Sequence, residues 1–407
     1  DLISYYEKIC WEGTREFSEI SSNCGECEYW TSNDDKEKGL LSGYKECFFH
    51  QYGWVEKDFS EPTLFDIWDF RNKGPLIEKD IIKMKDVTDQ DLKLKSDNKP
   101  GCSRTERQSL QILKVKNNDQ SIWIDRNNLK KEMDSWNYPL HFIDFETSKV
   151  AIPFNKGRRP YEDYAFQFSH HIMYENGEIE HKGEYINTNR GKFPNYEFLR
   201  HLKKELETDR GTIFRYAAHE NTILNCIYEQ LQEDENFIED RQELCDFILD
   251  ITESKQRKHC GDRSMVDLCQ IIIRYYFDPL TGGSNSIKKV LPGILNQSSF
   301  LQEKYSKPIY GACNGIKSHN YSDWTWINFQ NGKVMDPYKL LLNDYDELLA
   351  IDDQVADGGE AMNAYAKMQY DDISEDEFIA LKKALLKYCE LDTFAMVMVY
   401  EGLKAFL

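Results

Sequence analysis

The chain has 407 residues, with 51 lysines and arginines against 71 aspartates and glutamates, which gives a formal net charge of −20. Apolar residues make up 40% and aromatic residues 13%, which excludes a chain that is disordered throughout. A length of this kind accommodates two or three domains of roughly 100–200 residues. Because a strongly negative protein repels phosphate, nucleic acid is expected to bind only at a local basic surface or through metal ions.

The sequence carries no membrane or export signal. No apolar run approaches the roughly 20 residues that a membrane helix needs, and the first residues lack the basic end and apolar stretch of a signal peptide. Most of the 11 cysteines stand singly in apolar segments, a usage typical of a reducing compartment. We therefore predict a cytoplasmic protein without membrane contact. Because the chain begins without Met, we expect it to be part of a longer protein.

Three regions follow one another along the chain. Residues 1–105 are irregular and cysteine-bearing, and they end in the loop SDNKPGCS, which predicts a small Cys-rich N-terminal domain. Residues 106–136 are predicted to be a connector, with a short strand at SIWID and a helix over RNNLKKEMDSW. Residues 137–407 have the pattern of an α/β domain.

Within this last region, the order of elements indicates the architecture. Strands are predicted over 140–147, 164–174, 178–187 and 212–218, with a short strand or helix start at 264–268. Helices are predicted over 194–207, 220–232 and 374–406, the last of them opened by a capping box of Ser374 and Glu377. Three strands in a row, followed by alternating helices and strands, favour a mixed sheet flanked by helices, as in RNase H-like folds.

The first strand of this region carries two acids. Asp144 and Glu146 are two residues apart, so alternation places both carboxylates on one face and turns Ile143 and Phe145 to the other. Two acids on one face of a buried strand are costly unless a cation neutralises them, and a divalent metal does so well. The alternative is a strand whose polar face is in solvent.

Further candidates follow along the chain. Glu220 comes directly after the strand at 212–218, and the carboxyl ends of strands are where α/β sites gather. Tyr388 and Asp392 are four apart on a predicted helix and therefore share a face, whereas Glu390 should point elsewhere. The combination is similar to the layout of DEDD exonucleases that have a tyrosine in their third motif.

Three segments carry a family resemblance. PLHFIDFETSKVAIPFNKGRRPYEDYAFQFSHHI, GGSNSIKKVLPGI and YCELDTFAMV resemble a bacterial domain-of-unknown-function family with a DEDD-type RNase H-like core, over about residues 139–407. The segments CGECEYW and SGYKEC resemble the cysteine region that precedes this core in the family. Longer members carry, further upstream, a nuclease domain resembling CRISPR-associated PD-(D/E)XK exonucleases, and such a domain is expected to be missing from this chain.

The resemblance implies a role for each matching residue. Asp144 and Glu146 match the first motif, and Tyr388 and Asp392 match the third. The second motif departs from the family pattern, because Glu220 stands where an Asp is expected. Such a site would hold two Mg²⁺ or Mn²⁺ ions about 4 Å apart. Asp144 would bridge them, Glu146 and Asp392 would bind the first ion, Glu220 would hold the second, and Tyr388 would orient the attacking water.

Two basic segments are candidates for contact with phosphate. The segment GGSNSIKK (282–289) is a loop that leads into a predicted helix N-terminus, where backbone amides favour anions. Its candidate phosphate contacts are Ser286, Lys288 and Lys289. Arg158 and Arg159 are weaker candidates of the same kind. In both segments the alternative is an ordinary solvated loop. Asp267, in the same basic stretch as the lysines, is expected to cap a helix rather than to bind a ligand.

The N-terminal region holds a candidate metal site. Cys24 and Cys27 form a C-x-x-C pair, and Cys47 and His50 form a C-x-x-H pair that nineteen residues separate from it. This spacing is typical of a structural Zn²⁺ site with three thiolates and one imidazole. Alternatives are an iron–sulfur cluster that recruits Cys10 or Cys102, and unrelated free cysteines.

Together these features predict a metal-dependent 3′–5′ exonuclease acting on DNA or RNA. A second hypothesis is a weak or inactive RNase H-like subunit that binds nucleic acid or a partner within a larger, defence-related nuclease assembly. A third is an assembly subunit whose acidic segments, 231–250 and 344–377, dock a basic protein partner. Divalent metal at Asp144 distinguishes the enzyme from the two binding proteins.

Overall fold

The computed structural model describes residues 1–14, 16–342, 355 and 357–407. The chain forms two compact units. Unit 1 comprises Asp1–Trp123 together with Phe277–Ser284, and unit 2 comprises Ile124–Tyr276 and Asn285–Leu407. A late segment of the chain thus belongs to the N-terminal unit. The boundaries at 105 and 137 stay predictions.

Unit 1 is built from short helices around a small apolar core. Its α-helices are α1 (Leu2–Glu12), α2 (Asn33–Glu37), α3 (Gly43–Tyr52), α4 (Gly74–Ile77), α5 (Asp89–Leu92) and α6 (Arg104–Lys116). Its 3-10 helices are η1 (Ser22–Glu26), η2 (Glu56–Ser60), η3 (Leu64–Asp66), η4 (Met84–Asp86) and η5 (Pro279–Thr281). Phe48, Leu64, Met84 and Val87 are almost fully buried at the centre of its core.

Unit 2 is organised around a five-stranded mixed sheet. Its strands are β2 (Leu140–Ser148), β3 (Tyr164–Met173), β4 (Ile179–Ile186), β5 (Ile213–Arg215) and β8 (Val266–Asp267), in the spatial order β4-β3-β2-β5-β8. The first three strands along the chain pair antiparallel, and β5 and β8 continue the sheet parallel to β2. The predicted α/β architecture with a mixed sheet is confirmed.

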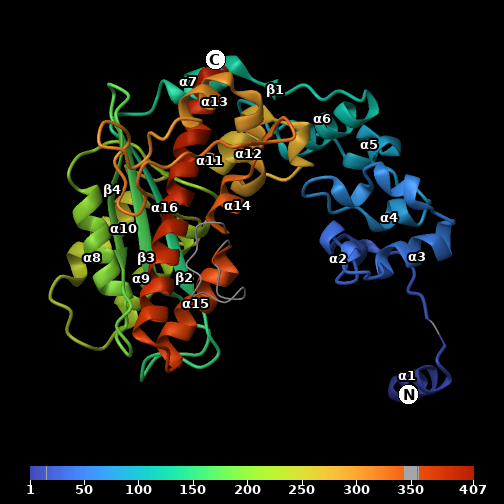
Figure 1. Cartoon of the computed structure of the whole chain (residues 1–407), viewed down its shortest axis with the longest axis horizontal. Helices are drawn as coiled ribbons and strands as arrows, with labels where there is room; N and C mark the ends of the chain where they lie inside the picture. Colours follow the sequence, from blue (N-terminus) through green and yellow to red (C-terminus); the bar gives the residue numbers. More distant parts are fainter. Residues whose placement is uncertain (15, 343–354, 356) are drawn as a thin grey trace. The chain divides into compact units, whose positions relative to one another are not determined.

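Helices cover both faces of this sheet (Figure 1). On one face, α8 (Asn195–Leu206), α9 (His219–Glu233) and α10 (Arg241–Ile251) enclose an apolar core with the sheet. On the other face, the long helix α16 (Glu375–Ala405) packs across β2, β3 and β4. The side chains that β2 turns toward this face therefore lie beneath α16, and α15 (Gly358–Tyr370) also contacts β2.

The remaining elements are short. The helices are α7 (Arg126–Met133), α11 (Leu268–Tyr275), α12 (Ile287–Gln297), α13 (Ser299–Tyr305), α14 (Pro337–Leu342) and α15 (Gly358–Tyr370). The two-residue strands are β1 (Trp123–Ile124), β6 (Glu253–Ser254), β7 (His259–Cys260), β9 (Tyr276–Phe277), β10 (Phe329–Gln330) and β11 (Lys333–Val334). Across the part of the chain that the structure describes, no helix is both long and apolar enough to cross a bilayer.

Two predicted helix caps are present. The side chain of Asp267 accepts a hydrogen bond from the backbone amide of Gln270 at the start of α11, so its expected capping role is confirmed. Ser374 caps α16 by accepting a hydrogen bond from the amide of Glu377, which is one of the two hydrogen bonds of the predicted capping box. Each cap satisfies an amide that the first turn of a helix leaves unpaired.

Candidate functional site

Strand β2 separates its acids from its apolar residues, as alternation predicts. Ile143 and Phe145 lie in the core beneath α8, α9 and α10. Asp144 and Glu146 point to the opposite face, where the thiol of Cys389 on α16 lies 3.8 Å from Oδ2 of Asp144. One ligand atom from each of Asp144, Glu146 and Cys389 lies within 4.8 Å of the others, a spacing that fits a bound metal ion.

Glu220 joins this cluster from the start of α9. Its side chain is 1% exposed, and its Oε2 has no hydrogen-bond partner among the described residues. The turn that delivers it is strained, because Ala217 adopts a left-handed conformation with φ of 68°. Asp267 holds this turn by accepting a hydrogen bond of 3.0 Å from the Ala217 amide. The fold therefore fixes a buried carboxyl group of which one oxygen, Oε2, has no donor among the described residues.

Helix α16 supplies the last two predicted residues. Asp392 is 8% and Tyr388 3% exposed, and both lie on the side of the helix that faces the cluster. Tyr338 of α14 donates a hydrogen bond of 2.5 Å to Oδ1 of Asp392, and its ring centre lies 6.3 Å from that of Tyr388. The five residues that sequence reasoning assigned to one site, Asp144, Glu146, Glu220, Tyr388 and Asp392, thus influence one another electrostatically.

Burial and mutual repulsion oppose ionisation of the carboxyls. Burial raises the pKa of Glu220 to about 8, with Asp267 and Asp392 adding to the effect. Burial also raises the pKa of Asp392 to about 6, although the Tyr338 hydroxyl and Lys288 act in the other direction. For Asp144 and Glu146, burial and then the charge of Asp392 raise the pKa well above the usual range. Cations among the four carboxylates would remove this cost.

Two neighbours of the carboxyls were not identified from the sequence. Cys389 is fully buried, and its thiol contacts Asp144. Tyr338 carries no local sequence signal, because it reaches Asp392 from 54 residues away along the chain. Only the assembled fold brings these two side chains to the acids.

The lysine segment lies beside the acids. The ammonium group of Lys288 stands 5.2 Å from the ring centre of Tyr388 and 5.1 Å from that of Tyr338, and its charge lowers the pKa of Glu146 and Asp392. Ser286 is the N-cap residue of α12 and is exposed, as is Lys289. The structure therefore places Lys288 next to the carboxyls, with Ser286 and Lys289 on the accessible end of the same helix.

The arginine segment has a different environment. Arg158 lies 3.1 Å from Asp234 and 3.3 Å from Glu162, and its guanidinium stacks on Phe193. Arg159 pairs with Glu233 at 2.7 Å. Both arginines thus contact the end of α9 and the residues after it, and the structure does not bring them to the carboxyl cluster through any contact described.

The acidic segment 231–250 is partly neutralised in the same way. Its acids pair with basic side chains of other segments, namely Glu233 with Arg159, Asp234 with Arg158, Asp240 with Arg200, Glu243 with Lys203 and Asp250 with Arg210. In the second acidic segment, 344–377, residues 344–354 and 356 lie outside the part of the chain that the structure describes. Docking of a basic partner to either segment stays a prediction.

The cysteines of unit 1 gather around α3 and η1. Cys24, Cys27 and Cys47 are partly buried, and the charges of Cys24 and Cys27 add to the burial that raises the pKa of the Cys47 thiol. His50, on the same helix as Cys47, stacks on Phe17 with ring centres 4.5 Å apart. Cys10 is exposed on α1, and Cys102 lies in the loop before α6. Three thiols therefore lie close enough to interact.

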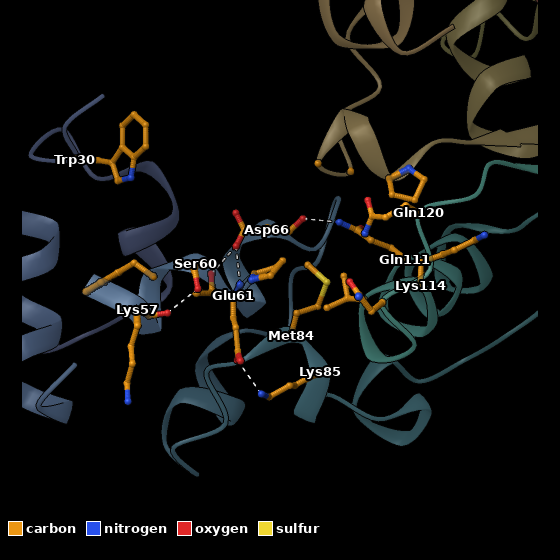
Figure 2. A pocket seen from close by; sticks show the side chains of 18 of the residues that line it. Trp30, Lys57, Ser60, Glu61, Asp66, Met84, Lys85, Gln111, Lys114 and Gln120 are labelled. Carbon is orange, nitrogen blue, oxygen red and sulfur yellow. Dashed lines mark hydrogen bonds and ion pairs between the residues drawn. The ribbon is translucent and has the colours of Figure 1, made fainter. Parts of the chain in front are cut away.

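Unit 1 also contains a cleft of about 1380 Å³ (Figure 2). Lysines and aromatic residues line it, including Trp30, Tyr44, Lys45, Lys85 and Lys114. Three of its lysines are paired with acids, since Lys45 lies 2.5 Å from Glu56, Lys85 2.8 Å from Glu61 and Lys114 2.7 Å from Asp119. These ion pairs offset part of the positive charge that the cleft could offer to a phosphate backbone.

The sequence was compared with known families, curated proteins and solved structures. No curated protein and no solved structure matches the chain significantly. Residues 141–286 match a family model described as a domain of unknown function (DUF2779). This stretch contains Asp144, Glu146 and Glu220 and ends before Tyr388 and Asp392. The chain thus carries a region, residues 141–286, that is similar to the DUF2779 family.

Proposed function

We propose that unit 2 is a metal-dependent exonuclease that hydrolyses phosphodiester bonds of DNA or RNA in the 3′–5′ direction. The observation that carries this proposal is the convergence of four carboxyl groups, of which that of Asp144 is partly buried and the other three are buried. One of the buried acids, Glu220, has an oxygen without a hydrogen-bond partner in the described structure. Acids with strongly raised pKa values that cluster in one place are typical of functional sites.

The sheet supports an RNase H-like assignment. Numbered along the chain, its five strands lie in the order 3-2-1-4-5, with the first three antiparallel and the last two parallel to the first. The first acids lie on the central strand, and Glu220 follows the neighbouring parallel strand. Ligands of α/β proteins bind at the carboxyl ends of such strands, where the chain changes direction across the sheet.

The residues present suit two Mg²⁺ or Mn²⁺ ions. Carboxylate oxygens are the ligands that these hard cations prefer, and Asp144, Glu146, Glu220 and Asp392 supply them. When bound, such a pair of ions stabilises the attacking and leaving oxygens of a phosphodiester. The thiol of Cys389 is a poor ligand for Mg²⁺, so we assign it to packing against Asp144.

The surrounding side chains have separate roles in this proposal. Tyr388 orients the attacking water, because its side chain faces Asp392 and Glu146 and so brings its hydroxyl to the carboxyl groups. Tyr338 holds the carboxylate of Asp392 in a fixed orientation through its hydrogen bond. Lys288 provides positive charge for the scissile phosphate at the N-terminal end of α12.

The direct test is degradation of labelled single- and double-stranded DNA and RNA by the full chain with Mg²⁺ or Mn²⁺, read at nucleotide resolution. The proposal predicts stepwise shortening from the 3′ end that stops when the metal is chelated. An inactive binding subunit, the alternative that the unusual Glu220 favours, would retain the substrate uncleaved under every metal condition. Shortening from the 5′ end or internal cleavage would contradict the direction.

For unit 1 we propose a structural Zn²⁺ site formed by Cys24, Cys27 and Cys47 with His50 as the fourth ligand. The mutual effect of the three thiols supports it, and an iron–sulfur cluster with Cys10 or Cys102 is the alternative. Cys24→Ser should remove one zinc per chain and lower the stability of unit 1, because structural metal binding contributes folding free energy. Cys313→Ser, at an exposed cysteine of unit 2, is the control. Protein prepared without chelators that contains neither zinc nor iron would refute the site.

A further inference from the structure

A second group of metal-ligating side chains lies on the same face of the sheet as the carboxyl cluster. His181 and Glu184 of β4 and Glu390 of α16 each offer one ligand atom, and these atoms lie within 4.8 Å of one another. Ser169 of β3 pairs with Asp144 on one side and with Glu184 on the other, so the second group is two strands away from the first. With a strand spacing of about 4.8 Å, this separation is roughly 10 Å.

An irregularity of β4 creates this group. His170 of β3 pairs with Gly183 and the next residue, His171, pairs with His181, so Lys182 is an extra residue in β4. Residues three apart on a regular strand point to opposite faces, whereas this bulge turns both His181 and Glu184 toward α16. Bulges are often conserved features that redirect a side chain next to a functional site.

The hydrogen bonds of Glu390 leave one of its oxygens directed at the group. Oε1 accepts hydrogen bonds from the hydroxyls of Tyr310, at 2.6 Å, and Ser318, at 2.5 Å. Oε2 faces His181 and Asn320, and it accepts hydrogen bonds from the Asn320 amide at 3.2 Å and from its side-chain nitrogen at 2.9 Å. The carboxylate is thus oriented by one oxygen while the other faces the remaining ligands.

His181 presents an unused nitrogen at the same point. Its ring is 2% exposed, and Nε2 lies 3.0 Å from the Ser169 hydroxyl. Nδ1 lies 3.2 Å from Oε2 of Glu390 but makes no aligned hydrogen bond among the described residues. A histidine whose one nitrogen is held by a hydroxyl and whose other nitrogen meets a carboxylate oxygen has the arrangement of a metal-binding imidazole.

Asn320 occupies the position between the two carboxylates. Its side-chain nitrogen donates to Oε2 of Glu184 at 2.6 Å as well as to Oε2 of Glu390. The neutral NH₂ group of Asn320 donates one hydrogen bond to each carboxylate. It thus stands where a cation could bind both carboxylates and neutralise their charge. Rotation of the amide by half a turn replaces this nitrogen with an oxygen, which is itself a metal ligand.

We propose that His181, Glu184 and Glu390, with the side-chain oxygen of Asn320, bind one divalent transition-metal ion, with Zn²⁺ as the expected occupant. An imidazole nitrogen favours Zn²⁺ over Mg²⁺ and Ca²⁺, and carboxylate oxygens complete its usual ligand set. Glu184 is half-buried, so the site has access to solvent. Nearly all its ligands come from β4 and α16, so the ion would join the edge of the sheet to the helix that carries Asp392. The site is independent of the nuclease proposal.

The test is the zinc content of the full chain after chelation and reloading with Zn²⁺ alone. Glu184→Gln keeps the size and hydrogen bonding of the side chain but removes its charge, and it should bind one zinc per chain fewer than the wild type. Glu180→Gln is the matched control, since Glu180 lies on the same strand but pairs with Lys317 at 2.8 Å outside the group. The measurement is repeated in an Asp144→Asn chain. If Glu184→Gln still removes one zinc there, the lost ion belongs to the group of His181, Glu184 and Glu390 and not to the carboxyl cluster. Equal zinc content in the Glu184→Gln and wild-type chains would overturn the proposal.

Asn320→Asp provides an independent test, because it keeps every proposed ligand and gives one of them a negative charge. In the metal-free chain, a third carboxylate should lower the Tm through repulsion. With Zn²⁺ it should raise the Tm by more than Zn²⁺ does in the wild type, because the new ligand is charged. An Asn320→Asp chain whose Tm does not respond to Zn²⁺ would likewise overturn the site.

Discussion

Glu390 and Asp392 are two residues apart on α16, yet their surroundings shift the pKa values of their carboxyl groups in opposite directions. Glu390 is fully buried, but the nearby His181 ring and hydrogen bonds from the hydroxyls of Ser318 and Tyr310 outweigh this burial and lower its pKa. Asp392 is almost as buried, and its donors do not compensate, so its pKa rises to about 6. Burial alone therefore does not determine whether an acid is ionised; the donors that reach its carboxyl group also decide it.

The same contrast separates the two faces of the helix. Toward β4, nearly every polar atom around Glu390 has a donor or acceptor in the protein. Toward β2, the charges that act on Asp144 and Glu146 are mainly those of other acids, namely Asp392 and Glu220. Because buried polar groups are normally satisfied, a cluster of acids with too few donors to offset their burial indicates a site that external cations complete.

The largest expected effect is that of Asp144→Asn on hydrolysis. The substitution keeps the shape of the side chain but removes the charge expected to bridge both ions, so activity should fall by at least about 10³-fold. Asp163→Asn, at a partly exposed aspartate that pairs with Lys149, is the control and should keep normal activity. Hydrolysis at the wild-type rate by a folded Asp144→Asn protein would remove the exonuclease assignment from these residues.

Tyr388→Phe should lower kcat by about 10²-fold with little change in substrate affinity, because a group that orients water acts mainly in the transition state. Tyr365→Phe is a matched control, since Tyr365 is a buried tyrosine that stacks on Phe166. Single-turnover rates separate the two effects. If Tyr388→Phe behaves like the control, Tyr388 belongs to the core and the third motif reduces to Asp392.

The acids also predict how stability depends on pH. Glu220 has a pKa of about 8 and Asp392 of about 6 in the folded chain, above the ordinary values of 4.5 and 3.8. The unfolded chain therefore releases these protons at lower pH, and the stability of the metal-free protein should fall as the pH rises from about 4 to about 8. Tm measured across this range should show a smaller fall in Glu220→Gln. Glu229→Gln, an exposed change on the same helix, should leave the slope unchanged.

The smallest expected effect concerns the two lysines of α12. Lys288→Ala should weaken substrate binding and reduce the salt dependence of affinity by about one unit of slope, since Lys288 lies beside Tyr388. Lys289→Ala, at an exposed neighbour, should have a smaller effect on affinity. Filter binding at several salt concentrations measures both. An equal loss in the two variants would indicate a general charge effect rather than a phosphate contact at Lys288.

Local periodicity was sufficient to predict part of the site. Alternation along β2 placed Asp144 and Glu146 together, and helical spacing separated Glu390 from Asp392. Both inferences use residues close in sequence on one regular element, where geometry is fixed by the element itself.

The rest of the site depends on long-range packing or on irregular backbone. The contact of Tyr338 with Asp392 joins residues 54 apart. The shared face of His181 and Glu184 depends on a bulge, which the period-two pattern cannot reveal. The return of Phe277–Ser284 to unit 1 has no signal in composition.

The most direct test of the central claim compares Glu390→Gln with Asp392→Asn in metal-free protein by urea unfolding. Glu390→Gln should lower the free energy of unfolding by about 1–3 kcal/mol, because it disrupts charged hydrogen bonds that are fully formed. Asp392→Asn should raise it, because it removes a buried charge among other acids. Mn²⁺ should then stabilise the wild type but not Asp392→Asn. Destabilisation of similar size by both substitutions, with no difference in the response to Mn²⁺, would contradict the account.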